Sequence, residues 1–300
     1  MPLRARSEPR IDDKIPHRML PHAVQQSERP LSSSRQSSPK ILRPCPLCSR
    51  DERTLFAHRD GWDVVQCSHC GMVFLGHELT YEAQQENHDW LEEYYKEGAR
   101  RKEKHPILVF LSRLTRPFKP ETNGRLLAQT LRWRKSGKLI DFGCGNGAFL
   151  ERARAEFDAI GIEMSPRSTA LARQCNPPER ILEGPLTEVA AALPEKRFDI
   201  VTQFGYIEHE WNPRAALDAA FRVLRPGGVT VLKTPNFASW NRKIMGADWV
   251  GYHIPAHCNY FTPRTLEMML RQAGFETLPR PLADRLPTSD SLWMAARRPS

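Results

Sequence analysis

Three glycines close together, Gly143, Gly145 and Gly147, constrain the fold of this chain more than any other feature of its sequence. The preceding residues 139–142 are mostly apolar, which is typical of a buried strand, and residues 148–157 have an amphipathic pattern. A strand, a glycine-rich loop and a helix form a nucleotide-binding turn, because glycines let the backbone approach a ligand closely. For the loop alone, a structural turn that binds nothing is the alternative.

Two classes of cofactor fit this loop. Gly143, Gly145 and Ala148 satisfy the spacing of dinucleotide-binding loops, G-x-G-x-x-G/A. Asp141 favours the other class, because its carboxylate would repel a pyrophosphate but attract the ammonium at the methionine end of S-adenosylmethionine (SAM). Glu163, at the end of the next predicted strand, does not discriminate, since both cofactors carry a ribose diol. The loop with Asp141 resembles the first motif of the class I SAM-dependent methyltransferases.

Several later motifs extend this resemblance. They are the F-D-x-[IV] strand from Phe198, I-E-H at residues 207–209, L-R-P-G-G at 224–228 and T-P-N at 234–236. In this order they closely resemble a methyltransferase subgroup that includes enzymes of ubiquinone and small-metabolite methylation. The resemblance covers roughly residues 137–275 and implies SAM as the cofactor, without defining the acceptor. Alternating strands and helices independently predict an α/β fold, a Rossmann-like parallel sheet with helices on both faces.

Cofactor contacts are expected in the glycine loop and at the carboxyl ends of the strands, where open parallel sheets bind ligands. Many relatives carry an acid or a small polar residue after the third-strand glycine to contact the adenine, but this chain has Pro185 there. Glu183 or a backbone amide would replace that contact, and Gln203 lies in the fourth predicted strand. The predicted cofactor-binding residues are Asp141, Gly143, Gly145, Gly147, Glu163, Glu183 and Gln203.

Two C-x-x-C pairs precede the methyltransferase-like region. Cys45 and Cys48 are separated by eighteen residues from Cys67 and Cys70, and this spacing is a strong signal for a tetrahedral zinc site with four thiolate ligands. Four protein ligands leave no open position on the ion, which indicates a structural role for the zinc rather than a catalytic one.

A hairpin is expected around the second cysteine pair. Residues 64–66 and 72–75 flank that pair with apolar side chains, which suits a zinc ribbon. His58 or His69 could replace one cysteine as a ligand, and four free cysteines without a metal are the remaining alternative.

Composition divides the chain into four segments. Residues 1–40 are rich in Pro, Ser, Arg and Gln without apolar periodicity, so a disordered tail is expected. Residues 41–76 form the predicted zinc ribbon, residues 77–136 a largely helical connector, and residues 137–300 the methyltransferase-like domain. The resemblance to class I methyltransferases implies that the connector helices form a lid over the cofactor. A helix is expected at residues 124–134.

Histidines are the candidate catalytic bases. A hydroxyl acceptor must lose its proton during or just after methyl transfer, and histidine accepts protons near neutral pH. His257 lies in an aromatic-rich insertion, residues 236–261, which is expected to act as a substrate lid, and His209 follows the fourth predicted strand. We rank His257 ahead of His209, with His253 third. The alternative is that all three only orient loops, since positioning alone can drive methyl transfer.

Charge and cysteine content limit the location and the partners. The net charge is +9, and residues 1–44 hold nine Lys/Arg against four Asp/Glu, so more than half of the excess lies far from the predicted site. No apolar run approaches the roughly 18 residues that cross a bilayer, and the N-terminus shows no secretory signal. Seven cysteines, four of them in metal-binding pairs, suit a reducing compartment, so a cytoplasmic location is expected.

These features together predict a SAM-dependent methyltransferase that acts on a hydroxyl or carbon of a small molecule. With its ribbon the chain is similar to sugar C-methyltransferases of deoxysugar pathways, although their additional C-terminal domain has no counterpart in the sequence. Two alternatives stay open. One is an RNA methyltransferase that uses the ribbon and the basic tail to bind nucleic acid. The other is a non-catalytic SAM-binding scaffold, for which Pro185 is the support. The sequence predicts no oligomeric state.

Overall fold

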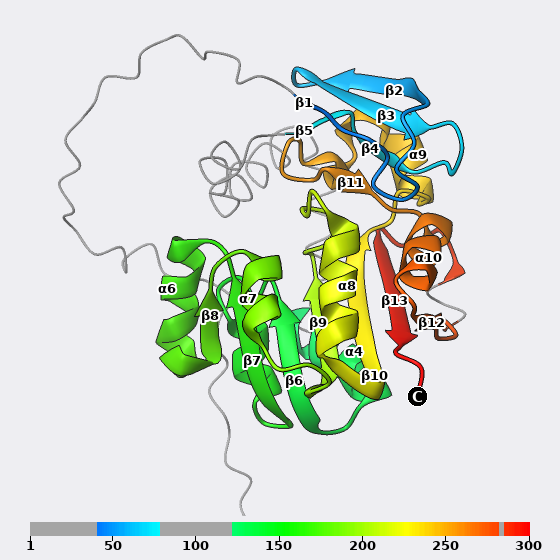
Figure 1. Ribbon diagram of the computed structural model, residues 1–300. Helices are drawn as coiled ribbons and strands as arrows, with labels where there is room; N and C mark the ends of the chain where they lie inside the picture. The colour runs from blue at the N-terminus through cyan, green and yellow to red at the C-terminus, as the bar shows by residue number, and fades with distance from the viewer. Residues whose placement is uncertain (1–40, 79–121, 282–284) are drawn as a thin grey trace, which may run out of the picture. The chain divides into compact units, whose positions relative to one another are not determined.

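The computed structural model describes residues 41–78, 122–281 and 285–300. The predicted disorder of residues 1–40 and residues 79–121 of the predicted connector (residues 77–136) lie outside this part of the chain. The helix expected at residues 124–134 is present, over Thr122–Trp133. Within the described part, three β-sheets are present, and helices cover both faces of the largest one (Figure 1).

The largest sheet is built from seven strands of the described residues. They are β6 (Gly137–Phe142), β7 (Phe157–Glu163), β8 (Ile181–Glu183), β9 (Phe198–Phe204), β10 (Leu224–Pro235), β12 (Glu276–Thr277) and β13 (Ser291–Arg297). Their order is β12-β13-β10-β9-β6-β7-β8. The pairs from β10 to β8 are parallel, whereas β13 is antiparallel to both of its neighbours. The predicted Rossmann-like α/β sheet is therefore confirmed.

Helices pack on both faces of this sheet. They are α4 (Thr122–Trp133), α5 (Ala148–Ala153), α6 (Pro166–Cys175), α7 (Leu186–Ala192), α8 (Pro213–Val223) and α10 (Pro263–Gln272). One apolar cluster joins α7, α8 and α10 to the sheet, and a second joins α4, α5 and α6 to its other face. Helix α5 is shorter than the amphipathic pattern predicts, because Phe157 is buried as the first residue of β7. No helix in the described ranges combines the length and the apolar character that spanning a bilayer requires.

A second, antiparallel sheet includes the strands before and after the second cysteine pair. Its strands are β2 (Arg53–Arg59), β3 (Trp62–Cys67), β4 (Val73–Leu75) and β11 (Asn259–Tyr260). A separate two-stranded sheet pairs β1 (Ile41–Leu42), which precedes β2 in the chain, with β5 (His77–Glu78), which follows β4. The pairing of β3 with β4 confirms the predicted hairpin. Strand β2 was not predicted, because its side chains are mostly exposed and lack the apolar alternation of a half-buried strand.

The predicted ribbon and the predicted methyltransferase-like region share one core. Strand β11 comes from the insertion at residues 236–261, yet it pairs with β4 of the ribbon. Met72 and Phe74 of the ribbon belong to the same apolar cluster as Ile207 and Phe261. The predicted domain boundary at residue 76 therefore divides the sequence into two segments, but a single apolar core contains side chains from both of them.

Most aromatic rings of the insertion are core rather than lid. The insertion contains helix α9 (Trp240–Met245), and its residues Trp249, Tyr252 and Tyr260 are each less than 10% exposed. They pack with Phe237 and with apolar side chains of β3 and β4. Only its last part, from His253 onward, reaches the cavity that is described next.

Candidate active site

A cavity of about 660 Å³ opens at the carboxyl ends of β6, β7 and β9. The glycine loop, the starts of α4 and α7, the segment after β9 and the end of the insertion surround it. Its position agrees with the rule that open parallel sheets bind ligands at this edge. The polar residues and glycines in its lining include Asp141, Gly143, Gly145, Glu163, Tyr206, Glu208, His209, Lys233, His253 and His257.

Two positions of the glycine loop have backbone conformations that favour glycine, and one of them also has no room for a Cβ. Gly143 has a φ of 72°, and a Cβ there would lie 2.4 Å from the Tyr206 ring. Gly145 has a φ of 55°, and its N–H donates to Oε2 of Glu163 at 2.8 Å. The loop is therefore held against the end of β7, and its backbone lines the cavity.

Asp141 and Glu163 bring two carboxylates to this cavity. Asp141 is 3% exposed, and its Oδ1 accepts a 2.6 Å hydrogen bond from the Thr202 hydroxyl. Burial raises the pKa of Asp141 to about 7; the Thr202 bond opposes this shift and the charge of Glu163 adds to it. Each oxygen of Glu163 accepts one 2.8 Å bond, from the N–H groups of Gly145 and Ser165. A carboxylate oxygen accepts more than one hydrogen bond, so Glu163 can also bind a ligand hydroxyl.

His209 and His257 come from distant parts of the chain, and the structure brings their ring centroids to 4.5 Å. Nδ1 of His209 lies 2.9 Å from the Ala256 carbonyl oxygen, and Nδ1 of His257 lies 2.9 Å from that of Gly251. Each carbonyl favours the tautomer with the proton on Nδ1, so Nε2 is the nitrogen that can accept a proton. Burial lowers the pKa of His257 to about 4, which makes it a weak base. The third candidate, His253, also lines the cavity.

Glu208 is a cavity residue that the sequence-based selection omitted. It is 2% exposed, its Oε2 has no hydrogen-bond partner among the described residues, and burial raises its pKa to about 7. Glu208, His209 and His257 bring their ligand-type atoms within 4.8 Å of one another, a spacing that a divalent cation could also use. The I-E-H stretch was the signal that could have identified Glu208. Lys233 also lines the cavity, and burial lowers its pKa.

Three of the predicted cofactor residues lie outside the cavity lining. Glu183 is exposed at the end of β8 and forms a 3.2 Å ion pair with Arg173. Gln203 is fully buried in β9 and donates to a hydroxyl of β10, because neighbouring strand residues face opposite sides and Phe204 faces the cavity. Gly147 precedes α5 with a φ of 76° and packs against α6. In the structure these three residues therefore contact other protein groups and do not line the cavity.

The four predicted zinc ligands form one cluster. The Sγ atoms of Cys45 and Cys70 lie 3.5 Å apart, as do those of Cys48 and Cys67, and all four lie within 4.8 Å of one another. In each pair, the backbone N–H four residues after the first cysteine donates to the carbonyl of that cysteine, so the two turns are alike. His58 is not part of the cluster and instead contacts Asp63 at 2.7 Å.

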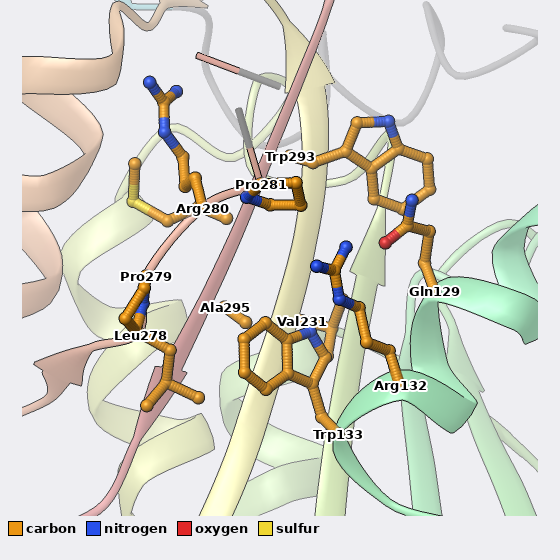
Figure 2. Close-up of a pocket in the computed structure, with 11 residues that line it drawn as sticks. Gln129, Arg132, Trp133, Val231, Leu278, Pro279, Arg280, Pro281, Trp293 and Ala295 are labelled. Carbon is orange, nitrogen blue, oxygen red and sulfur yellow. The ribbon is translucent and has the colours of Figure 1, made fainter. Parts of the chain in front are cut away.

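A much smaller cavity, of about 20 Å³, lies beside the middle of β10 and β13 (Figure 2). Gln129, Arg132 and Trp133 of α4 and Trp293 of β13 line it, together with the segment after β12. It has room for about one water molecule, and no acid or histidine is among these described lining residues. It is therefore not a candidate for the chemistry.

Comparison with protein families decides the assignment. A family model described as a methyltransferase domain matches residues 113–279, more than half of the chain, and this range includes the glycine loop and the strand ends around the large cavity. The chain belongs to the class I SAM-dependent methyltransferases. The predicted family is therefore confirmed, and the chain is an enzyme.

Two curated relatives of this methyltransferase illustrate the similarity. A ubiquinone biosynthesis O-methyltransferase of Cereibacter sphaeroides is 32% identical over 153 residues, which cover 48% of this chain and 62% of that protein. A probable S-adenosylmethionine-dependent methyltransferase of Mycolicibacterium smegmatis is 33% identical over 150 residues, 49% of this chain and 56% of that protein. Both matches span less than two thirds of the relatives' own length.

Among solved structures, a SAM-dependent methyltransferase from Archaeoglobus fulgidus superposes with a TM-score of 0.48 and 18% sequence identity. The superposition covers 64% of this chain and 99% of that one.

Proposed function

We propose that this methyltransferase transfers the methyl group of SAM to a hydroxyl oxygen of a small-molecule acceptor. The observation that carries the proposal is one cavity that holds both the Asp141 and Glu163 carboxylates and the His209–His257 pair. Its volume of about 660 Å³ is typical of sites for small ligands and cofactors. The similarity to ubiquinone biosynthesis O-methyltransferases favours a hydroxyl acceptor over a carbon acceptor. It therefore also disfavours transfer to a sugar carbon.

The proposed cofactor contacts follow from charge. SAM supplies a methyl group on a positively charged sulfur, and its methionine end carries an ammonium. We assign Asp141 to the ammonium and Glu163 to the ribose hydroxyls, with the backbone of Gly143 and Gly145 against the cofactor. A cation beside Asp141 favours its ionised form, which offsets the cost of burying this carboxylate.

For proton transfer, we assign His209 as the group that would take the acceptor's hydroxyl proton on Nε2. The acceptor oxygen would bond to the methyl carbon as the bond between that carbon and the SAM sulfur breaks, with S-adenosylhomocysteine as the leaving group. This reverses the order predicted from the sequence, because burial lowers the pKa of His257 to about 4, which makes His257 a poor base near neutral pH. His257 then orients His209, since the two rings meet edge to face.

The ribbon is proposed to hold one structural zinc ion. Tetrahedral coordination with Zn–S bonds of about 2.3 Å places the sulfurs about 3.8 Å apart, and the observed pairs at 3.5 Å fit this geometry with small adjustments. Burial would raise the pKa of Cys67, but the N–H groups of Cys70 and His69 lower it to about 7. Burial raises the pKa values of Cys45 and Cys70, so a cation is what would favour their thiolates.

The test of the proposed function is mass spectrometry of a small-molecule extract after incubation with the enzyme and methyl-labelled SAM. We expect the label in a hydroxyl-bearing metabolite as a new methyl ether, and no label with the Asp141→Ala variant. Label only in RNA, or bound SAM without any labelled product, would contradict the proposal.

A further inference from the structure

Arg43 of the ribbon lies between the two segments that carry His209 and His257. It is 3% exposed. Its Nη1 donates to the Cys258 carbonyl at 3.0 Å, and its Nη2 donates to the Trp211 carbonyl at 2.6 Å and to Oδ1 of Asn259 at 2.9 Å. One guanidinium therefore joins the segment after β9 to the end of the insertion.

Asn259 makes the same connection from the side of the insertion. Its Nδ2 donates to two carbonyls of the segment after β9, at 3.2 and 2.7 Å. The backbone N–H groups of Cys258 and Asn259 both donate to the Glu208 carbonyl, at 2.9 and 3.1 Å. His209 follows Glu208 and His257 precedes Cys258 in sequence, so these bonds fix the spacing of the two histidines.

The ribbon sheet supports the same residues. Strand β11 pairs with β4, with Asn259 opposite Phe74, and the N–H of Leu75 donates to the Cys258 carbonyl at 3.0 Å. That carbonyl thus receives one hydrogen bond from β4 and one from Arg43. Strand β4 begins three residues after Cys70, and Arg43 lies two residues before Cys45. Both supports are therefore anchored next to the metal ligands.

We propose that the ribbon is a structural part of the acceptor site and that Arg43 is a positioning residue, through which methyl transfer depends on the zinc-bound ribbon. This inference rests on the proposed function, since it needs the histidine pair at the acceptor and zinc in the ribbon. Arg43 is not among the residues that line the cavity, so it acts through His209 and His257. The contacts proposed for SAM come from β6, β7 and the loop between them, which Arg43 does not hold in place.

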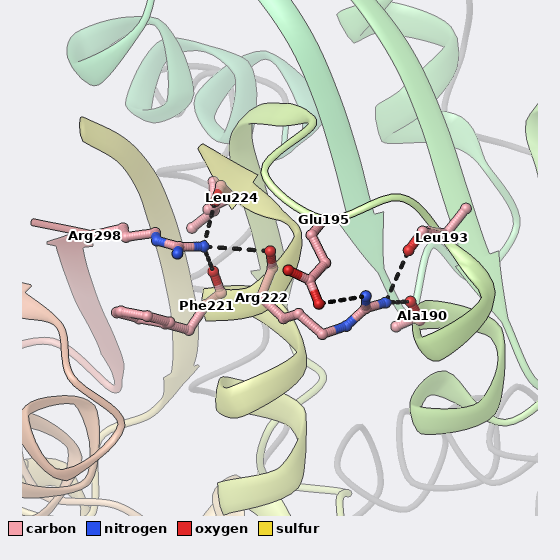
Figure 3. Close-up of polar contacts among 7 residues, drawn as sticks. All are labelled: Ala190, Leu193, Glu195, Phe221, Arg222, Leu224 and Arg298. Atoms are coloured by element: carbon pink, nitrogen blue, oxygen red, sulfur yellow. Dashed lines mark hydrogen bonds and ion pairs between the residues drawn. The ribbon is translucent and has the colours of Figure 1, made fainter. Parts of the chain in front are cut away.

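Arg298 provides a matched control (Figure 3). Its Nη1 also donates to three oxygens, the carbonyls of Phe221, Arg222 and Leu224, at 2.6, 3.3 and 2.8 Å. Its guanidinium lies 4.5 Å from the Phe221 ring centroid, as that of Arg43 lies 5.0 Å from the Trp211 ring. Arg298 directly follows β13 and binds the end of α8 and the first residue of β10, near the amino ends of the parallel strands, and it is not part of the cavity lining. Its loss removes a similar set of bonds without touching the histidine segments.

The test compares Arg43→Met, Arg43→Lys and Arg298→Met in the full chain with zinc bound. SAM affinity comes from calorimetry, the mobility of residues 207–211 and 256–261 from hydrogen–deuterium exchange, and turnover from the acceptor that the labelled-methyl experiment identifies. For Arg43→Met we expect exchange in both segments to rise at least about tenfold and turnover to fall about 10²-fold, with SAM affinity within a few-fold. Arg43→Lys restores part of the turnover, because lysine donates but lacks the planar fork.

Removal of zinc from the unmodified chain should raise exchange in the same two segments and spare the glycine loop. Arg298→Met should change neither the exchange of these segments nor turnover. Equal turnover losses in the Arg43→Met and Arg298→Met variants would overturn the proposal, as would loss of SAM binding in both Arg43 variants or unchanged exchange in Arg43→Met. If no acceptor is methylated, the proposed function fails, whereas calorimetry and exchange still decide whether the ribbon holds the histidine segments.

Discussion

Replacement of Glu163 by glutamine is the sharpest test of the cofactor site. The carboxylate of Glu163 accepts two backbone hydrogen bonds of 2.8 Å, one from the glycine loop at Gly145 and one from Ser165 at the start of α6. A glutamine amide has one carbonyl oxygen, so its NH₂ group would face one of these N–H donors. The variant loses the negative charge proposed to bind the ribose and one of the two bonds that shape the loop. Loss of one charge-assisted hydrogen bond costs ~1–3 kcal/mol.

That cost corresponds to SAM binding weakened by roughly 5- to 150-fold. Isothermal titration calorimetry with SAM and with S-adenosylhomocysteine measures it, and the two ligands should lose affinity equally because both carry the ribose. The matched control is Glu183→Gln, since Glu183 ends the neighbouring strand β8 but is exposed, pairs with Arg173 and lies outside the cavity. Its SAM affinity should match that of the unmodified chain. Equal losses in both variants, or unchanged affinity in Glu163→Gln, would refute the placement of the cofactor.

Three further predictions concern pH, the metal and the histidines. Asp141 must be ionised to bind the ammonium of SAM, and its pKa of about 7 implies that affinity falls about tenfold for each pH unit below that value; titrations across this range would show no such slope if another group binds the ammonium. Elemental analysis of protein purified without chelators should find one zinc ion per chain. Cys48→Ser should abolish zinc binding and leave SAM affinity within a few-fold, and equal loss of SAM affinity would contradict a separate cofactor site. His209→Ala should lower turnover by about 10²–10⁴-fold with little change in SAM affinity, and His257→Ala should lower it less; the reverse order in steady-state assays would restore His257 as the base.

Local patterns were enough to predict the fold class, the cofactor and four cysteines as metal ligands. Asp141 and the glycines of its loop are close in sequence, and their chemistry depends on the backbone conformations that glycine allows, so the prediction needed no distant contacts. Each C-x-x-C pair likewise forms its own turn, and the four sulfurs do converge in the structure. The parallel sheet followed from the alternation of strands and helices, because crossover rules leave few other arrangements.

Which side chains meet in the cavity depended on tertiary contacts. Gln203 carries a plausible cofactor-binding group, but the two-residue period of β9 turns it toward β10, and a strand pattern alone does not tell which face meets the ligand. Glu208 looks like an ordinary acid in sequence, and its raised pKa arises only from burial by other parts of the chain. His257 was ranked first for its place in a long insertion, and burial of that same residue lowers its pKa.

The packing of the ribbon against the segments that carry His209 and His257 is the largest feature that the sequence did not reveal. Arg43 and Asn259 are more than two hundred residues apart, and neither belongs to a recognisable motif. Strand β11 has two residues, too few for any periodic signal, and its partner β4 is already explained locally by the zinc-ribbon hairpin. Hydrogen bonds between such short segments form only when the surrounding core has brought them together, so folding of the whole chain, rather than local preference, decides them.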